Sequence, residues 1–279
     1  MNTNTKKRVK LTIFFLVALY IGLNPLGFYS RFEFLPEGYD PNKYAVADKI
    51  PHEDIYIPLS NGKKIHAWYF PVSGAKHTVI VHHGQGNNIA FFFPVAQLFH
   101  NCGVSVLSYD YEGYGRSDGP TAHIALRRDS EAAHNYVRDV KKVPESQIVH
   151  CGISMGTGAA CDVASRQKCA GVFLCSPYWS TTAIANSFVP ISRLYPRCAF
   201  PQPDFSAASL VKKKIPIMIV HGDNDPIIPL SHAQKIYDLA VGPKELFIVK
   251  NGFHVGSLAP GIEDFCIKWL NSLPSEIAN

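Results

Sequence analysis

Short apolar runs that alternate with stretches of helical spacing are the feature of this sequence that most limits its fold. Runs bounded by turn residues occur at residues 77–83, 104–110, 146–152, 170–176, 215–222 and 244–250. Continuous apolar runs of this length are typical of strands buried on both faces. Strands that alternate with helices predict an α/β fold, in which a mostly parallel central sheet carries helices on both faces.

Turn and helix signals fill in the order of the elements. The runs "DIYIPL" and "KIHAWYF" flank Asn61–Gly62, which is a strong hairpin signal. We expect helices over residues 89–103, interrupted early by Pro94, and over 125–140, 231–242 and 262–270; Gly242 would be the C-cap of the third. The composition does not change after residue 50, so we expect one domain over residues 53–279.

The N-terminal thirty residues differ from the rest. The segment Leu11–Ser30 contains no charged residue. Its twenty residues are about enough to cross a bilayer as a helix. Four cations precede it and no Ala-x-Ala-like cleavage site follows, so we expect a signal anchor over residues 1–30 with the body on the non-cytoplasmic side. A cleaved signal peptide and a buried core helix are the alternatives. Residues 31–52 are expected to be an irregular linker.

Composition excludes several classes of protein. The chain is 47% hydrophobic and 18% charged, which is ordinary for a packed globular protein. Its net charge is +5, but the four cations near the N-terminus leave only +1 on the remainder, so no nucleic-acid partner is indicated. The seven cysteines form no C-x-x-C pair, and neither a zinc knuckle nor a dithiol site is expected. We predict no cofactor and no metal, and the oligomeric state stays open.

One serine stands between two glycines at a strand-to-helix junction. The stretch "GISMG", Gly152 to Gly156, matches G-x-S-x-G, a pattern that needs a tight turn to expose the serine hydroxyl above the sheet. The pattern alone is weak, because a glycine-rich strand end with a capping serine has the same appearance. Ser154 is therefore a candidate nucleophile only if a base and an orienting acid are available.

An acid and a histidine follow at the ends of later strands. "HGDNDPIIP" offers Asp223 and Asp225 after one apolar run, and "NGFHVG" offers His254 after the next. Ligands of open α/β sheets lie at the carboxyl ends of the strands, so these side chains are expected near Ser154. Taken singly, Asp225 is as well explained by a turn and His254 by a loop.

Attack by a serine on a carbonyl also requires backbone donors for the oxyanion. The amide that follows the nucleophile, that of Met155, is one expected donor. The loop "HHGQGNN", His82 to Asn88, should supply the second, and Gln85 is our candidate. A glycine-rich turn ahead of a helix is the structural alternative.

Together these motifs resemble the α/β-hydrolase superfamily of serine hydrolases, over roughly residues 53–272. "DYEGYGRSDG", Asp110 to Gly119, is similar to a structural loop of that family, so no chemical role is expected for it. The resemblance selects Asp225 over Asp223 as the acid and implies acyl transfer to Ser154, with His254 as the base. It also implies a short lid at about residues 177–214.

The N-terminal apolar segment resembles that of single-pass members such as acyl-protein thioesterases and monoacylglycerol lipases. The expected reaction is hydrolysis of an acyl ester or thioester presented from a membrane. Lid aromatics could form the acyl pocket or only the lid's own core. A serine-aminopeptidase-like peptidase, a non-catalytic tethered binding protein and a metal hydrolase built from His82, His83, His221 and Asp223 are the alternatives.

Overall fold

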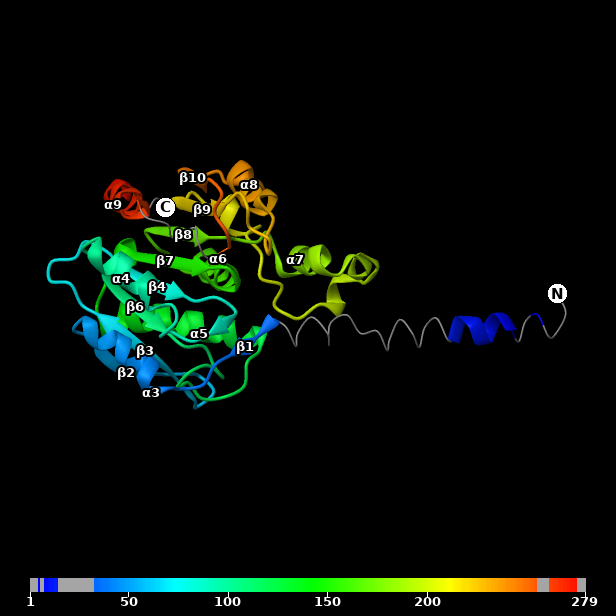
Figure 1. The fold of residues 1–279 in the computed structure, drawn as a ribbon, viewed down its shortest axis with the longest axis horizontal. Coiled ribbons are helices and arrows are strands. Elements are labelled where there is room, and N and C mark those ends of the chain that lie inside the picture. The colour runs from blue at the N-terminus through cyan, green and yellow to red at the C-terminus, as the bar shows by residue number, and fades with distance from the viewer. Residues whose placement is uncertain (1–4, 6–7, 15–32, 255–260, 275–279) are drawn as a thin grey trace.

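The computed structural model describes residues 5, 8–14, 33–254 and 261–274, and the central sheet lies within this part of the chain. Its eight strands stand in the order β10-β9-β8-β7-β4-β6-β3-β2 (Figure 1). Their bounds are β2 Glu53–Pro58, β3 Lys64–Phe70, β4 Thr78–His82, β6 Ser105–Tyr109, β7 Ile148–Ile153, β8 Gly171–Cys175, β9 Ile217–Gly222 and β10 Lys244–Val249.

The sheet is mostly parallel, as the alternating pattern predicts. Strands β6, β4, β7, β8, β9 and β10 run parallel to one another. The hairpin of β2 and β3 adds an antiparallel edge, since β3 pairs antiparallel with both β2 and β6. Every residue of β4, β6, β7, β8 and β9 is buried, which explains why these strands are continuous apolar runs rather than alternating ones.

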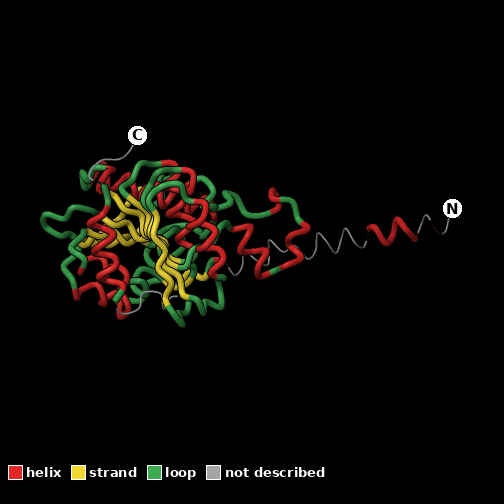
Figure 2. The backbone as a smooth tube through the Cα atoms, turned by 90° about the horizontal axis from the view of Figure 1, so that it is seen from above, coloured by secondary structure: helices red, strands yellow, loops and turns green. Residues whose placement is uncertain are grey.

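Helices cover both faces of the sheet (Figure 2). Side chains of α4 and α9 pack on one face with Val79 and Val81, and those of α5, α6 and α8 pack on the other. The helices are α3 Pro41–Tyr44, α4 Phe93–Asn101, α5 His123–Asn135, α6 Met155–Arg166, α7 Thr181–Phe188, α8 Leu230–Leu239 and α9 Ile262–Ser272. A π-helical turn, Tyr136–Val140, extends α5, and short 3₁₀ turns occur at Ala45–Lys49, Glu145–Gln147, Pro190–Leu194, Arg197–Ala199 and Leu210–Lys212.

Two helix signals turn out differently from the prediction. Pro94 does not interrupt a helix, because α4 begins only at Phe93 and proline is tolerated in the first turn. Gly242 is not the C-cap of α8, since the helix ends at Leu239 with Ala240 as its cap. A Cβ at Gly242 would lie 2.7 Å from the carbonyl oxygen of Ile215, so glycine permits a close approach of two loops there.

The segment expected to be an irregular linker packs against the domain. Tyr44 and Ala47 are buried, and β1 (Leu35–Pro36) pairs in parallel with β5 (Gly86–Asn87) in the loop after β4. Residues 33–50 therefore form part of the wall around that loop. In Figure 1, β1 and α7 lie on the same side of the domain, beyond the carboxyl ends of the parallel strands.

The predicted membrane segment, residues 1–30, lies largely outside the described residues. Within the part of the chain that the structure describes, no helix combines the length and the hydropathy needed to cross a bilayer.

Candidate active site

Ser154 occupies the turn between β7 and α6 in a conformation that few residues adopt. Its backbone angles are φ 52° and ψ −116°, outside the regions that L-residues prefer. The turn is anchored on its strand side, because the Ser154 amide donates a 2.9 Å hydrogen bond to the carbonyl oxygen of Cys175 on β8. Such a strained position is held by its surroundings and is found most often at functional sites.

The two glycines of the motif make room for this turn. A Cβ at Gly152 would lie 2.5 Å from the Cα of Thr157, and one at Gly156 would lie 2.0 Å from the carbonyl oxygen of His82. Both contacts are with backbone atoms that cannot move aside cheaply. The pattern G-x-S-x-G is therefore a steric requirement of the close packing of β7, α6 and the end of β4.

The structure brings together the three side chains that the sequence placed at separate strand ends. The Ser154 hydroxyl donates to Nε2 of His254 over 2.8 Å. Nδ1–H of His254 donates to Oδ2 of Asp225 over 2.7 Å. This is the order of groups in which an imidazole can remove the serine proton while a carboxylate holds the ring.

Asp225 is fixed and ionised by several donors. Burial by itself would raise its pKa, but the hydrogen bond from His254 and those from the amides of Ile227 and Ile228 outweigh it and lower the pKa. The side chain of Asp225 is fully buried and that of His254 is 12% exposed. The carboxylate therefore remains charged where it can stabilise an imidazolium.

The two expected oxyanion donors lie on the same cavity as Ser154. Met155 is the first residue of α6, where backbone N–H groups have no partner within the helix. Gln85 is held through its peptide neighbours: His83 Nδ1–H donates to the Gly84 carbonyl oxygen over 2.7 Å. In a trans peptide this carbonyl and the Gln85 N–H point in opposite directions, so His83 sets the direction of the Gln85 amide.

Two tyrosines of the loop after β6 hold the Gln85 loop through hydrogen bonds to its backbone carbonyl oxygens. The Tyr114 hydroxyl donates to the Gln85 carbonyl oxygen over 2.6 Å, and the Tyr111 hydroxyl donates to the carbonyl oxygen of His83 over 3.1 Å. The Leu35 amide on β1 also donates to the Gln85 oxygen, over 3.1 Å. The two peptide units that flank the Gly84–Gln85 peptide are thereby held in place.

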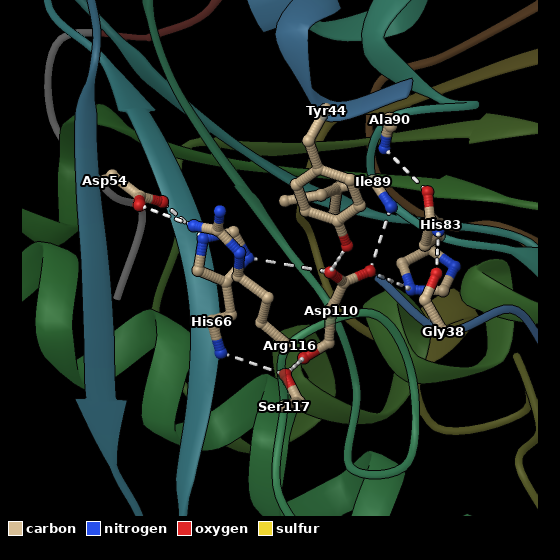
Figure 3. Close-up of polar contacts among 11 residues, drawn as sticks. Gly38, Tyr44, Asp54, His66, His83, Ile89, Ala90, Asp110, Arg116 and Ser117 are labelled. Atoms are coloured by element: carbon tan, nitrogen blue, oxygen red, sulfur yellow. Dashed lines mark hydrogen bonds and ion pairs between the residues drawn. The ribbon is translucent and has the colours of Figure 1, made fainter. Parts of the chain in front are cut away.

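Asp110 also helps to hold the Gln85 loop (Figure 3). It is the first residue of the loop Asp110 to Gly119, for which no chemical role was expected. Its fully buried carboxylate accepts from the Tyr44 hydroxyl over 2.5 Å and from the Ile89 amide over 2.9 Å. Figure 3 shows Arg116 of this loop beside Tyr44, and its guanidinium donates to Asp54 over 2.8 Å. The network ties the former linker, the hairpin and the Gln85 loop together without touching Ser154.

A cavity of about 550 Å³ opens beside the serine. Ser154, Gln85 and Glu33 are its polar residues, and the others are Met155, Tyr178, Ile184, Phe188, Val189, Ile227 and Ile228. Among the lid aromatics, Tyr178 and Phe188 line it and the others do not; these others are Trp179, Tyr195, Phe200 and Phe205. Phe205 instead packs in the core with Tyr178.

Two polar residues of this site were not found by sequence reasoning. Glu33 lines the cavity and bonds to His123, the first residue of α5. Neither residue belongs to a motif. Because they are 90 positions apart, no local sequence pattern indicates that they bind each other. The four residues of the metal-site alternative are also dispersed: among the described residues, no group of three histidine, cysteine or acidic side chains is placed to hold an ion.

The parallel sheet, the helices on both faces and a serine on the tight turn after β7 define the α/β-hydrolase fold. The comparisons with known proteins agree with this fold. Residues 73–203 match the family described as "Serine aminopeptidase, S33".

Similar proteins extend over most of the chain. "Uncharacterized protein YfhR" of Escherichia coli (strain K12) is 28% identical over 89% of this chain and 88% of its own length. "Alpha/beta hydrolase domain-containing protein 17C" of Xenopus tropicalis is 34% identical over 59% of this chain and 52% of its own. The Pyrococcus furiosus esterase Pf2001 has the same fold, with a TM-score of 0.69 at 19% identity, over 86% of this chain and 97% of the esterase.

Proposed function

We propose that this protein is a serine hydrolase that cleaves carboxylic ester or thioester bonds of acyl or lipid-like substrates. The observation that carries the proposal is the continuous hydrogen-bonded series from Ser154 through His254 to Asp225. Its occurrence on a strained turn, next to a cavity with two candidate amide donors, matches the needs of acyl transfer. The esterase named above has the same fold and supports this choice.

The reaction divides into two acyl transfers. Ser154 Oγ attacks the carbonyl carbon while His254 Nε2 takes its proton, and the amides of Gln85 and Met155 stabilise the oxyanion. His254 then gives the proton to the departing alkoxide or thiolate, which leaves an acyl-enzyme. Water, deprotonated by His254, attacks this ester and releases the acid with Ser154 restored. Asp225 holds the imidazole in the tautomer that both steps need.

The mostly apolar cavity supports an acyl chain as the group that fills it. Its volume of about 550 Å³ falls in the range of small-molecule sites. We further propose that residues 1–30 anchor the protein, with the catalytic domain on the non-cytoplasmic side, because a twenty-residue uncharged run follows four cations. The substrate would then be presented at the bilayer surface.

A peptidase is the second candidate, and two observations favour it. The matching family is described as serine aminopeptidase, and such an enzyme needs a carboxylate for the substrate's amine. Glu33 is a carboxylate in the cavity. Glu33 is already paired with His123, however.

Replacement of the nucleophile tests the proposed function. We expect Ser154→Ala to lose hydrolysis of 4-nitrophenyl acyl esters by on the order of a millionfold and to lose labelling by a fluorophosphonate. Ser165→Ala is the matched control, because it removes a hydroxyl from the same helix that bonds only to the Asp162 carbonyl oxygen. Persistent labelling of Ser154→Ala, or activity that disappears with a chelator, would contradict the proposal. Exclusive cleavage of aminoacyl amides would favour the peptidase instead.

A further inference from the structure

The cavity beside Ser154 contains a carboxylate that the proposed acyl transfer does not use. Glu33 lines it together with Gln85 and Ser154, although the other walls are almost entirely apolar. The residue is 9% exposed, so this side chain is withdrawn from solvent. Carboxylates are rarely buried unless they are paired, and one that faces a substrate cavity calls for a chemical explanation.

His123 is the partner of this carboxylate. Its Nε2 lies 2.6 Å from Oε2 of Glu33, and the two side chains are 5% and 8% exposed. The opposite ring nitrogen, Nδ1, lies 3.1 Å from the carbonyl oxygen of Pro203. The ring also stacks on Phe205, with centroids 5.6 Å apart. His123 is therefore held on both edges and one face.

The charge of the pair follows from what each partner can donate. A carbonyl oxygen only accepts, so Nδ1 of His123 carries a proton. The short contact between Nε2 and Glu33 needs one more proton, which either side can hold. The pair is imidazolium with carboxylate or imidazole with carboxylic acid, and in both cases its net charge is zero.

Glu33 stands near the reacting groups. Leu35, two residues further on, donates its amide to the carbonyl oxygen of Gln85, the expected oxyanion residue. Tyr178 lines the same cavity, and burial raises the pKa of its hydroxyl. A substrate bound at Ser154 therefore has an acceptor oxygen within the same enclosed space.

We propose that Glu33, held by His123, determines specificity by accepting a hydrogen bond from a hydroxyl group of the substrate. The preferred substrates are then hydroxyl-bearing esters, either acyl esters of a polyol or esters of a hydroxylated acyl chain. This inference rests on the proposed serine hydrolase function and specifies its substrate class.

A hydroxyl suits this position better than an ammonium group. An ammonium would lose most of its hydration in an apolar cavity, and a pair of zero net charge does not compensate for that loss. A hydroxyl is far less costly to bury, and one hydrogen bond to a carboxylate oxygen satisfies its donor. The pairing with His123 thus argues against the amine subsite that an aminopeptidase would need.

Matched substrates test the proposal on the full-length protein. Propyl octanoate and 1-octanoylglycerol differ by two hydroxyls on the alcohol part, and ethyl octanoate and ethyl 8-hydroxyoctanoate differ by one at the end of the acyl chain. Octanoylcholine and ethyl 8-aminooctanoate supply a cation at the same two places. The quantity compared is kcat/KM for each substrate relative to its unsubstituted partner.

We expect the wild-type enzyme to prefer the hydroxylated member of at least one pair by about tenfold to a hundredfold, as one buried hydrogen bond allows. Glu33→Leu should bring this ratio close to one. Glu33→Gln, which keeps a partner for His123 and so protects the fold, should lower it by a smaller factor because a neutral acceptor is weaker. Glu37→Gln is the matched control, since its carboxylate pairs with Lys43 at the surface, and it should keep the wild-type ratio.

Three results would overturn the inference. They are equal ratios in wild type and in both Glu33 variants, a wild-type preference for neither hydroxylated ester, or a Glu33-dependent preference for the cationic substrates. Ser154→Ala separates this outcome from failure of the proposed function. If Ser154→Ala loses all turnover but the kcat/KM ratios do not change in the Glu33 variants, the serine hydrolase proposal stands and only the hydroxyl subsite is wrong.

Discussion

The molecule uses histidine in two contrasting ways within one domain. His254 has on one ring nitrogen the serine that lines the cavity and on the other a carboxylate. His82, His150 and His134 instead form a continuous chain from the central strands β4 and β7 to helix α5, and all three are fully buried. The side chain is the same in both places, so the difference lies in the surroundings.

The buried chain contains only uncharged partners at its joints. His82 contacts the Tyr109 hydroxyl at 2.6 Å and His150 at 2.9 Å, and His150 contacts His134 at 3.1 Å. Burial lowers the pKa of His82 to about 3 and that of His134 to about 4, and it lowers the pKa of His150 as well. Each neutral ring carries one proton, so the hydrogen bonds must all run in the same direction.

The comparison shows what a histidine needs to act as a base. His254 is bonded to the serine that lines the cavity and to an ionised carboxylate that can stabilise its protonated form. The buried chain is closed off from solvent, and the Glu145 carboxylate stays 3.8 Å from Nε2 of His134, too far for a hydrogen bond. The three rings therefore stay neutral and act as structural hydrogen-bonding groups that join β4, β7 and α5. Chemistry is therefore expected from the one and stability from the other.

The largest effect should come from removing the charge next to His254. In Asp225→Asn the amide oxygen can still accept from Ile227 and Ile228, but its NH₂ group would donate to Nδ1 of His254. That places the ring proton on Nε2, where it cannot receive the proton of Ser154. We expect kcat to fall by about 10⁴-fold with little change in the free energy of unfolding. Steady-state kinetics measures the change in kcat. Full activity of Asp225→Asn would contradict the distinction drawn between His254 and the buried histidines.

Removing the centre of the buried chain should affect stability instead. His150→Leu leaves one ring nitrogen of His82 and one of His134 without a partner, which we expect to lower the free energy of unfolding by about 3 kcal/mol. Tyr109→Phe removes a partner from the end of the chain and should cost about half as much. Urea unfolding gives both values. A folded His150→Leu protein without esterase activity would show that the chain takes part in catalysis.

The smallest effect, counted per pH unit, concerns the pH dependence of stability and sharpens the comparison further. For His82 and His134 the folded-state pKa lies below the ordinary value of 6.5, so the unfolded chain binds more protons in between. Their contribution to stability is complete above pH 6.5 and is lost as the pH falls. Between pH 6.5 and 4 we expect about 1.4 kcal/mol per pH unit from each.

The variant His134→Gln should reduce this dependence by the share of one histidine. Its free energy of unfolding, measured by urea titration at several pH values, should match the wild-type slope above pH 7. If the variant and the wild type had the same slope of unfolding free energy between pH 6.5 and 4, His134 would bind its proton as readily in the folded state as in the unfolded state.

The fold was predictable from the sequence because its strands are buried on both faces and interrupted by clear turn residues. The same pattern placed Ser154, Asp225 and His254 at strand ends, and parallel strands necessarily bring such ends to one edge. The hairpin at Asn61–Gly62 followed from two residues with a specific turn preference. Local sequence signals were sufficient for features that depend on a single strand or turn.

The remaining features depend on contacts between distant segments. Glu33 reaches His123 only because β1 pairs with β5, and a two-residue strand has no periodicity to detect. The cap at Gly242 failed because a neighbouring loop, rather than the helix, determines that position. Likewise, no spacing reveals that Asp110 binds Tyr44 and Ile89. Three-dimensional packing had to be known first.

The left-handed backbone of Ser154 has a consequence for reuse of this scaffold. A non-glycine residue in such a conformation costs about 1–3 kcal/mol, and glycine adopts it without that strain. A designer who wanted a binding receptor rather than a catalyst could place glycine at position 154 and recover this energy as thermal robustness. With Ser154 as the proposed nucleophile, reactivity and stability compete at a single residue.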